Sequence, residues 1–433
     1  MSLIPTDELS AIIHWQGQTL VVNAFAGTGK ASTLVQYALA NPDSRMLYLV
    51  YNRSVRDEAE RKFPFNVECK TSHQLAWSRF GRHYRNRLVA SLRITDDVAR
   101  KLNTRHWLLV HLALSSLNQF LCSADKESGL QRLPDEDARA GTDVSAILQA
   151  VQVLWHEMSR PDGTFPVTHD TCLKLFQLSS PDLSRRWDTI LFDEAQDANP
   201  VTSALVLCQS CRVILVGDRY QQIYRFRGAD NALSHPTLND ADRLWLTQSF
   251  RFGPSVARMA NLLLQRAGET LQVTSSGGED EILMSCIGAD KSEGHQAVLS
   301  RAVAGVICTA QMASLSDRNV YRMGGIEGYR TEAREDLYWF SVEMPKKMQS
   351  DVLRRDFRDF DAYCRIAKST WDVELNQAIR LLDICFPLPL KLKLIREHTV
   401  TSEKEADITV SMTHRSKGLE WPVVKRFRIQ AGG

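Results

Sequence analysis

The sequence lacks the features that mark secreted, membrane-inserted and repetitive proteins. Its nine cysteines are scattered, without the dense spacing of a disulfide scaffold, which indicates reduced thiols in a cytoplasmic protein. No run of about 18 apolar residues occurs, and the N-terminal segment has no basic stretch followed by an apolar one. We therefore expect no export and no membrane contact. No internal repeat or low-complexity tract is evident.

A strong charge of either sign is also missing. The 53 Lys and Arg residues stand against 51 Asp and Glu residues, so the formal net charge is +2. Any surface for a polyanionic partner must therefore be local. With 433 residues, 44% of them hydrophobic, the chain has apolar material for more than one core, which predicts two to four domains.

Apolar segments alternate with helical ones as a parallel α/β sheet requires. Strands are predicted at residues 19–24, 46–51, 187–192 and 212–216, and a second set includes 297–300 and 407–413. Residues from about 80 to 185 and from about 330 to 400 have a helical period and interrupt this alternation. The pattern predicts an α/β fold with two lobes, each carrying a helical insertion.

A glycine-rich turn, Ala24-Phe-Ala-Gly-Thr-Gly-Lys30, lies between the first predicted strand and a helix. Its glycines allow backbone N–H groups to point at phosphate oxygens, and its lysine reaches the outer phosphates. The next residue is Ala31, where a Ser or Thr hydroxyl normally ligates magnesium, and Ser32 lies about 100° further round the helix. Nucleotide binding should survive better than hydrolysis. The predicted nucleotide-binding residues here are Ala24, Phe25, Ala26, Gly27, Thr28, Gly29, Lys30, Ala31 and Ser32.

Two carboxylates follow another predicted strand, in the segment Leu191-Phe-Asp-Glu-Ala-Gln-Asp197. Ligands of open α/β sheets gather at the carboxyl ends of the strands. We expect Asp193 to hold Mg²⁺, directly or through water, and Glu194 to take a proton from the water that attacks the phosphoanhydride.

These motifs belong to a longer ordered set that resembles the UvrD/Rep branch of superfamily 1 helicases, most closely its smaller members related to the F-box DNA helicase. Shorter segments at residues 51–53 and 71–73 fit the same pattern. Five motifs in order, covering nearly the whole chain, make the resemblance specific. Besides the two motifs above, they are Val216-Gly-Asp-Arg-Tyr-Gln-Gln-Ile-Tyr-Arg-Phe-Arg-Gly-Ala229, Gln248-Ser-Phe-Arg251 and Thr413-His-Arg-Ser-Lys-Gly-Leu-Glu-Trp421.

The resemblance implies two RecA-like lobes with parallel sheets, with ATP and Mg²⁺ bound between them. It also implies roles for single residues. Gln221 would sense the outer phosphate, and Arg251, from the second lobe, would act as an arginine finger. Phe250 would stack on the adenine. Gly418 and Glu420 would form a nucleotide-facing turn.

The resemblance further implies a DNA partner, either single-stranded DNA or a single-strand/duplex junction. Tyr224 and Phe226 would face the bases, since base–aromatic stacking tolerates any sequence. Thr413 and His414 would approach the DNA backbone, and Thr71 and His73 would also bind DNA. Protein partners are not predicted.

Domain boundaries follow from the same comparison of patterns. We expect residues 1–80 and 186–250 to form the first RecA-like lobe and 81–185 its helical insertion. Residues 251–326 and 405–433 would form the second lobe, and 327–404 its insertion.

Three departures from the family pattern weaken the expected hydrolysis. They are Ala31, Leu9 where the family has a glutamine for the adenine edge, and a chain that stops at Gly433 before a sixth motif. Two functions therefore stay open: an ATP-dependent 3′-to-5′ DNA helicase or translocase, and a non-catalytic, nucleotide-gated DNA-binding module. The intact Lys30, Asp193, Glu194, Gln221 and Arg251 favour the first. A small-molecule P-loop kinase would need no second lobe.

Basic residues gather at the beginning of the first helical insertion. They fit either a solvated helical face or a surface that tracks phosphates. Cys208 and Cys211 have CxxC spacing without a second ligand pair, so we predict no metal site there. The basic residues are Arg79, Arg82, Arg85, Arg87, Arg93, Arg100, Lys101 and Arg105.

Overall fold

The computed structural model describes residues 5–50, 53–92, 96–133, 139, 141–223, 229–283, 294–325, 329–370 and 373–427. The chain divides into two compact units. The first comprises Met1–Arg93, Ala113–Pro134 and Asp143–Ser285, and the second comprises Ile94–Leu112, Asp135–Thr142 and Cys286–Gly433.

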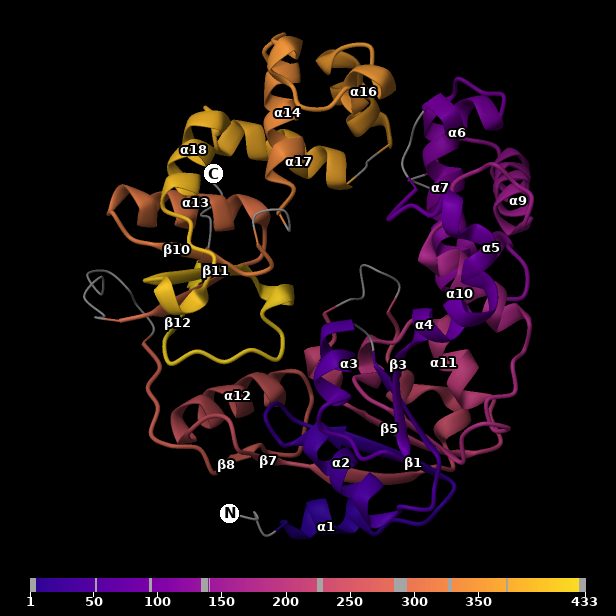
Figure 1. Ribbon diagram of the computed structural model, residues 1–433, viewed down its shortest axis with the longest axis vertical. Helices are drawn as coiled ribbons and strands as arrows, with labels where there is room; N and C mark the ends of the chain where they lie inside the picture. The colour runs from indigo at the N-terminus through magenta and orange to yellow at the C-terminus, as the bar shows by residue number, and fades with distance from the viewer. Residues whose placement is uncertain are drawn as a thin grey trace. The chain divides into compact units, whose positions relative to one another are not determined.

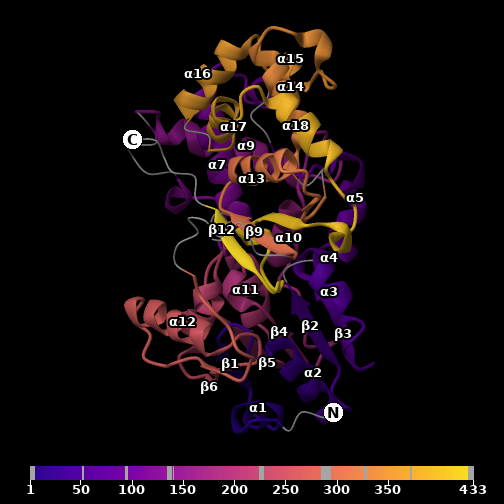
Figure 2. The same ribbon diagram turned by 90° about the vertical axis from the view of Figure 1, so that its left-hand side faces the viewer.

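A parallel sheet of six strands forms the centre of the first unit, in the order β3-β2-β4-β5-β1-β6 (Figures 1 and 2). Four of these strands, β1, β2, β4 and β5, were predicted as apolar runs, and they are buried along nearly their whole length because both faces of the sheet are covered. The strands are β1 (Thr19–Ala24), β2 (Met46–Val50), β3 (Val67–Thr71), β4 (Thr189–Phe192), β5 (Arg212–Gly217) and β6 (Asp242–Leu246).

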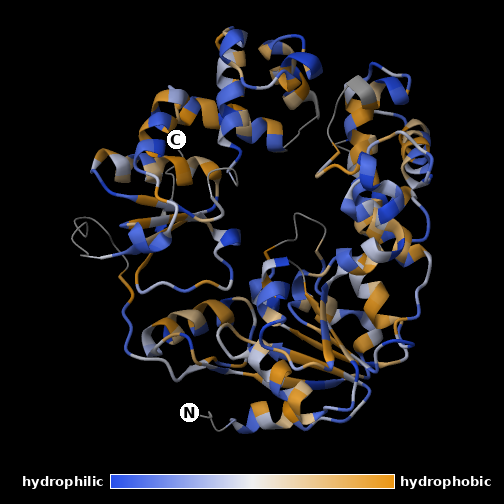
Figure 3. Ribbon diagram, viewed as in Figure 1, coloured by the Kyte–Doolittle hydropathy of each residue, from blue (hydrophilic) through white to orange (hydrophobic). Residues whose placement is uncertain are grey.

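One face of this sheet packs on the three helices α1 (Asp7–Ile13), α2 (Lys30–Ala40) and α3 (Arg53–Ala59). Their apolar residues, among them Ile12 and Leu34, form a core with alternate strand residues such as Leu20 and Ile214. The other strand residues, such as Val21 and Leu215, are also fully buried. The strands are accordingly drawn mostly in hydrophobic colours (Figure 3).

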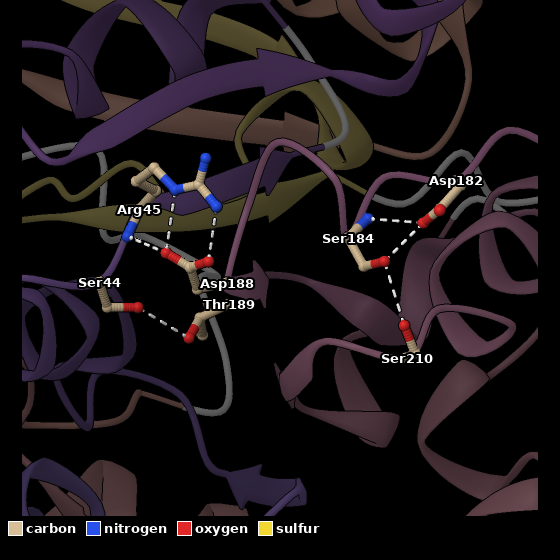
Figure 4. Close-up of polar contacts among 7 residues, drawn as sticks. All are labelled: Ser44, Arg45, Asp182, Ser184, Asp188, Thr189 and Ser210. Atoms are coloured by element: carbon tan, nitrogen blue, oxygen red, sulfur yellow. Dashed lines mark hydrogen bonds and ion pairs between the residues drawn. The ribbon is translucent and has the colours of Figure 1, made fainter.

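Polar contacts fix the amino ends of β2 and β4 (Figure 4). The Arg45 guanidinium donates to both carboxylate oxygens of Asp188, at 3.1 and 2.8 Å. The hydroxyls of Ser44 and Thr189 are 3.1 Å apart. These contacts lie at or just before the register pair Met46 and Thr189, at the end of the sheet opposite the carboxyl ends.

A helical segment lies between β3 and β4, but it does not group as one body: Ile94–Leu112 and Asp135–Thr142 belong to the second unit and its other residues to the first. Its helices are α4 (Ser72–Ala76), α5 (Arg82–Tyr84), α6 (Asp96–Lys101), α7 (Trp107–Cys122), α9 (Val144–Ser159) and α10 (His169–Leu178). Helix α11 (Pro200–Leu207) follows between β4 and β5.

Residues 251–283 group with the first unit, beyond the boundary that the sequence suggested at residue 250. The short strands β7 (Gln248–Ser249) and β8 (Thr274–Ser275) pair there. The Asp280 carboxylate accepts from the backbone N–H groups of Gly253 and Ser255 at 2.7 and 2.8 Å, which holds the start of α12 (Pro254–Arg266). Arg251 therefore belongs to the same unit as the glycine-rich turn.

The second unit contains a parallel sheet of four strands in the order β10-β11-β9-β12. A helical block separates β10 from β11 in sequence, as predicted, and packs with α13 around one apolar core. Among the described residues, no helix is long and apolar enough to cross a bilayer. The elements are β9 (Gln296–Ser300), α13 (Val303–Leu315), β10 (Val320–Arg322), α14 (Thr331–Ser341), α15 (Val352–Asp356), α16 (Phe360–Thr370), α17 (Val373–Ile384), α18 (Leu388–Glu397), β11 (Ile408–Met412) and β12 (Val424–Phe427).

Candidate active site

Three neighbouring strands bring polar groups to one edge of the first unit. Strand β5 lies between β4 and β1, and all three are parallel, so their carboxyl ends meet. Asp193 follows β4, Asp218 follows β5, and the glycine-rich turn follows β1. This edge is where open α/β sheets bind ligands.

The glycine-rich turn has the backbone shape of a phosphate loop. Gly27 and Gly29 have φ angles of 75° and 81°, a region that favours glycine. The buried Thr28 hydroxyl donates to the Phe25 carbonyl at 2.9 Å and fixes the turn. A Cβ atom added to Gly29 would meet nothing within 4 Å, so open space lies beside the start of α2. The turn and this helix N-terminus fit a phosphate group.

The first turn of α2 carries few hydroxyl groups that could replace the one missing at Ala31. Ala31 and Ser32 are both exposed. Thr33 is buried, and its hydroxyl donates to the Gly29 carbonyl at 2.9 Å. A local backbone bond therefore occupies the Thr33 hydroxyl, and the position after Lys30 has no hydroxyl of its own.

Asp193 is a buried carboxylate held from the neighbouring strand. The Tyr48 hydroxyl donates to Asp193 Oδ2 at 2.6 Å, and the Glu194 N–H donates to Oδ1 at 2.8 Å. Burial, and then the charge of Glu194, raise the pKa of Asp193 to about 6, while Tyr48 and Lys30 oppose this shift. Each oxygen keeps lone pairs free. A hard cation with oxygen ligands, such as Mg²⁺, fits this group.

Glu194 and Asp218 are joined through one fully buried side chain, Gln196. Its amide N–H donates to Glu194 Oε2 at 2.5 Å, and its amide oxygen accepts from the Asp218 N–H at 3.0 Å. Glu194 itself has a left-handed backbone with φ of 53°, which an L-residue rarely adopts. Residues at functional sites often hold such conformations.

Gln221 contacts Asp218 directly. Its amide N–H donates to Asp218 Oδ2 at 2.7 Å, and the Tyr220 N–H donates to Oδ1 at 2.9 Å. Burial raises the pKa of Asp218, and the Gln221 bond and the charge of Lys30 oppose that rise. Lys30, Gln221 and both acidic strand ends thus form one electrostatic group.

The segment with Phe250 and Arg251 passes directly against the glycine-rich turn. The Phe250 N–H donates to the Gly27 carbonyl at 2.9 Å. A Cβ atom on Gly27 would lie 2.5 Å from both Arg251 Cβ and Ser249 Oγ, so this approach requires glycine. The sequence placed Arg251 in a second lobe; the structure instead places it beside the turn, within the first unit.

Two of the predicted DNA-facing residues lie on α4 and its cap. Thr71 is buried, and its hydroxyl accepts from the Gln74 N–H at 3.3 Å as the helix N-cap. His73 Nε2 lies 3.0 Å from Asp170 Oδ1. A small cavity of about 30 Å³ is lined by His73, Asp193 and Glu194, among others. Tyr224 and Phe226 lie outside the described residues.

The remaining predicted residues lie in the second unit. Thr413 is exposed, follows β11, and its hydroxyl donates to the Ser300 carbonyl at 3.3 Å. His414 is half-buried, while Gly418 and Glu420 are exposed. Gly418 has a φ of 83°, which fits a tight turn.

A larger cavity, of about 540 Å³, lies beside the glycine-rich turn within the first unit. Its lining includes Glu8, Phe25 and Trp245. The Glu8 carboxylate accepts from the N–H and the hydroxyl of Thr247 at 2.8 and 2.7 Å. Leu9 packs against the core of this unit instead, in keeping with its inability to bond a base edge.

No sequence pattern predicted a role for Tyr48, Gln196 or Asp218. For Tyr48, a phenol inside an apolar strand already signals a buried hydrogen-bond partner. Gln196 lies within the acidic motif itself. The partners of all three depend on strand order, which the sequence did not reveal.

Comparisons with known proteins find similarity to DNA helicases. The family model for the UvrD/REP helicase N-terminal domain matches residues 97–241. F-box DNA helicase 1 of Gallus gallus is 30% identical over 94% of this chain and 43% of its own length. F-box DNA helicase protein 1 of Schizosaccharomyces pombe is 28% identical over 97% of this chain and 52% of its own length. DNA helicase IV of Escherichia coli is 35% identical over 18% of this chain and 13% of its own length.

The chain therefore spans about half the length of the F-box helicases that it matches. The similarity to these two helicases extends over nearly all of this chain. By these similarities the chain is related to UvrD/REP-type DNA helicases.

Proposed function

We propose that this chain is an ATP-dependent translocase or helicase that moves 3′ to 5′ on single-stranded DNA. The observation that supports this most is the hydrogen-bonded group of the partly exposed Glu194 and the buried Asp193, Gln196 and Asp218 beside a phosphate loop. The direction of movement rests on the family resemblance. The substrate would be single-stranded DNA or a single-strand/duplex junction.

Each residue of the group has a distinct role in this proposal. Lys30 and the N–H groups of the turn bind the outer phosphates. Asp193, supported by Tyr48, holds Mg²⁺, which when bound stabilises charge on the phosphates. Glu194, oriented by Gln196, accepts the proton of the attacking water. Gln221, which is hydrogen-bonded to Asp218, senses the outer phosphate.

The remaining site residues are proposed from the resemblance. Phe250 would stack on the adenine, and Arg251 would stabilise the charge that develops on the outer phosphate. Gly418 and Glu420 would form the nucleotide-facing turn of the second lobe. The DNA-facing residues would be Thr71, His73, Tyr224, Phe226, Thr413 and His414. The four-part domain organisation is proposed with them.

One observation favours a second function. Ala31 leaves the magnesium position without a hydroxyl, and neither Ser32 nor Thr33 replaces it. A non-catalytic module that binds DNA in a nucleotide-dependent manner would retain everything else in this site.

Displacement of streptavidin from single-stranded DNA separates the two functions. In the presence of ATP and Mg²⁺, a 3′-to-5′ translocase removes streptavidin from a 5′-biotinylated strand and leaves it on a 3′-biotinylated one. Displacement from the 3′ end would contradict the direction. DNA binding with no displacement from either end would support the non-catalytic module.

A further inference from the structure

Three exposed arginines lie on the helical segment that follows β3. The segment runs from Ser72 to Arg87 through α4, a π-helical turn at Trp77–Gly81, α5 and a short 3₁₀ turn at Arg85–Arg87. Residues three apart on a helix surface are neighbours, with Cβ atoms about 5–6 Å apart. We call Arg79, Arg82 and Arg85 the arginine row. Helix α5, which carries the middle residue of the row, is drawn in hydrophilic colours in Figure 3.

The opposite side of the segment is packed, which fixes the side that carries the row. Gly81 and Tyr84 are buried, and α4 and the π-helical turn pack against α10. The Tyr84 hydroxyl donates to the Ser159 carbonyl at 2.6 Å. The arginine row is therefore held on the exposed side of an anchored helix.

The local charge around the arginine row is strongly positive. Residues 69–95 contain six basic residues and no acidic one. Among the described residues, no carboxylate forms an ion pair with Arg79, Arg82 or Arg85. Arg87 differs, because its guanidinium donates to the carbonyls of Glu157 and Phe165 at 3.1 and 2.9 Å and so holds the end of α9.

The aromatic residues of this segment show which form of DNA fits. Surfaces for single strands combine basic residues with exposed rings that stack on bases. Here Tyr84 is buried, the Trp77 ring lies 5.8 Å from the His169 ring, and Arg79 lies over the Phe80 ring at 5.9 Å. The Trp77 and Phe80 side chains are only partly exposed, and the tyrosine is buried. Arginines beside rings that are not fully open to bases suit a phosphate backbone.

We propose that the arginine row binds the phosphate backbone of duplex DNA. The helical segment that carries the arginine row begins beside Thr71 and His73, the residues proposed to face the single strand. The row would thus hold the duplex part of a single-strand/duplex junction. This inference rests on the proposed function, because it assumes that a DNA junction is the substrate.

The salt dependence of DNA binding tests whether the arginine row contacts phosphates. Fluorescence anisotropy gives the affinity of the full chain for a blunt duplex and for a single strand between roughly 50 and 200 mM salt. The test variant is R79Q/R82Q/R85Q. The matched control is R45Q/R160Q/R185Q, which removes the same charge from exposed arginines that are ion-paired with Asp188, Asp162 and Asp182. Thermal unfolding checks that both variants are folded.

Loss of three phosphate contacts should make the slope of log K against log salt for duplex shallower by about 2.7. Between roughly 50 and 200 mM salt, the variant should then lose roughly 40-fold less duplex affinity than the unmodified chain. The control and the single-strand slopes should stay at the values of the unmodified chain. Equal duplex slopes for both variants would overturn the proposal. A reduced slope for the single strand alone would overturn the assignment to duplex. ATP turnover of the unmodified chain, measured separately with single-stranded DNA, tests the proposed function independently.

Discussion

At the scale of single residues, Tyr48 shows how a neighbouring strand supports the acidic strand end. Tyr48→Phe removes the donor to Asp193 Oδ2 and nothing else from this buried position. Loss of a hydrogen bond to a metal-binding side chain commonly lowers metal affinity at least 10-fold. We expect roughly a 10-fold increase in the Mg²⁺ concentration that half-saturates binding of a fluorescent ATP analogue.

The matched control for this change is Tyr37→Phe. Tyr37 is also a buried tyrosine of the first unit, but its hydroxyl accepts from Arg212 at 3.0 Å, away from Asp193. Its removal should leave the Mg²⁺ requirement unchanged. An equal requirement in Tyr48→Phe and the unmodified chain would contradict the role of Tyr48.

Ala31 provides the second test at this scale. Ala31→Thr adds a hydroxyl at the first turn of α2, where it can ligate Mg²⁺. ATP turnover should rise by on the order of 10-fold, as metal-site changes of this kind usually give. Ser32→Thr keeps a hydroxyl at the neighbouring, exposed position and should change turnover little. If the two variants behave alike, the vacant ligand position does not limit hydrolysis.

The sequence predicted the site residues whose chemistry is local. The glycine-rich turn and the Asp193–Glu194 pair each follow a strand directly, so pattern and spacing suffice to find them. The bridge from Glu194 through Gln196 to Asp218 joins β4 to β5. It depends on which strands are adjacent, and that is a tertiary property.

At the scale of elements, burial decided which strands could be predicted. The strands β1, β2, β4 and β5 are covered on both faces and appear as apolar runs. The edge strands β3 and β6, with sequences VECKT and DRLWL, are only partly buried, so their patterns are mixed. Edge strands commonly carry charged residues, which limits edge-to-edge pairing.

Lys174 is an element-scale feature that the sequence concealed. It is fully buried on α10, and its ammonium donates to the carbonyls of Ser123 and Asp125, just beyond the end of α7. The ammonium also lies 4.4 Å from the centre of the Phe120 ring. A cation at a helix C-terminus interacts favourably with the helix dipole. Burial nevertheless lowers the pKa of Lys174 from 10.5 to about 8.

This shift makes stability depend on pH. Between pH 8 and 10.5 the unfolded chain holds the Lys174 proton more strongly than the folded chain, so the free energy of unfolding rises with pH. Below pH 8 both states are protonated and this contribution is constant. Relative to Lys174→Met, the unmodified chain should gain about 1–2 kcal/mol between roughly pH 7.5 and 9.5, measured by urea unfolding. The exposed Lys126→Met should show no such gain, and a parallel pH dependence in Lys174→Met would contradict the assignment.

At the scale of the whole molecule, the division into units was the hardest property to predict. Motif order suggested that Arg251 opens a second lobe. The pairing of β7 with β8 and the Asp280 contacts instead hold residues 251–283 to the first unit. These contacts join residues that are distant in sequence; Asp280 and Ser255, for example, are 25 positions apart. No local sequence pattern predicts such contacts.

Our proposal for the whole chain is that the acidic strand ends and the phosphate loop form a DNA-dependent ATPase. The most direct measurement is Mg²⁺-dependent ATP turnover with and without single-stranded DNA, for the unmodified chain, Glu194→Gln and the exposed control Glu127→Gln. We expect DNA to stimulate turnover in the unmodified chain and the control. Glu194→Gln should lower turnover by roughly 10²–10⁴-fold while nucleotide still binds. Turnover that Glu194→Gln leaves intact, or an unmodified chain that binds DNA and nucleotide without turnover, would contradict the claim.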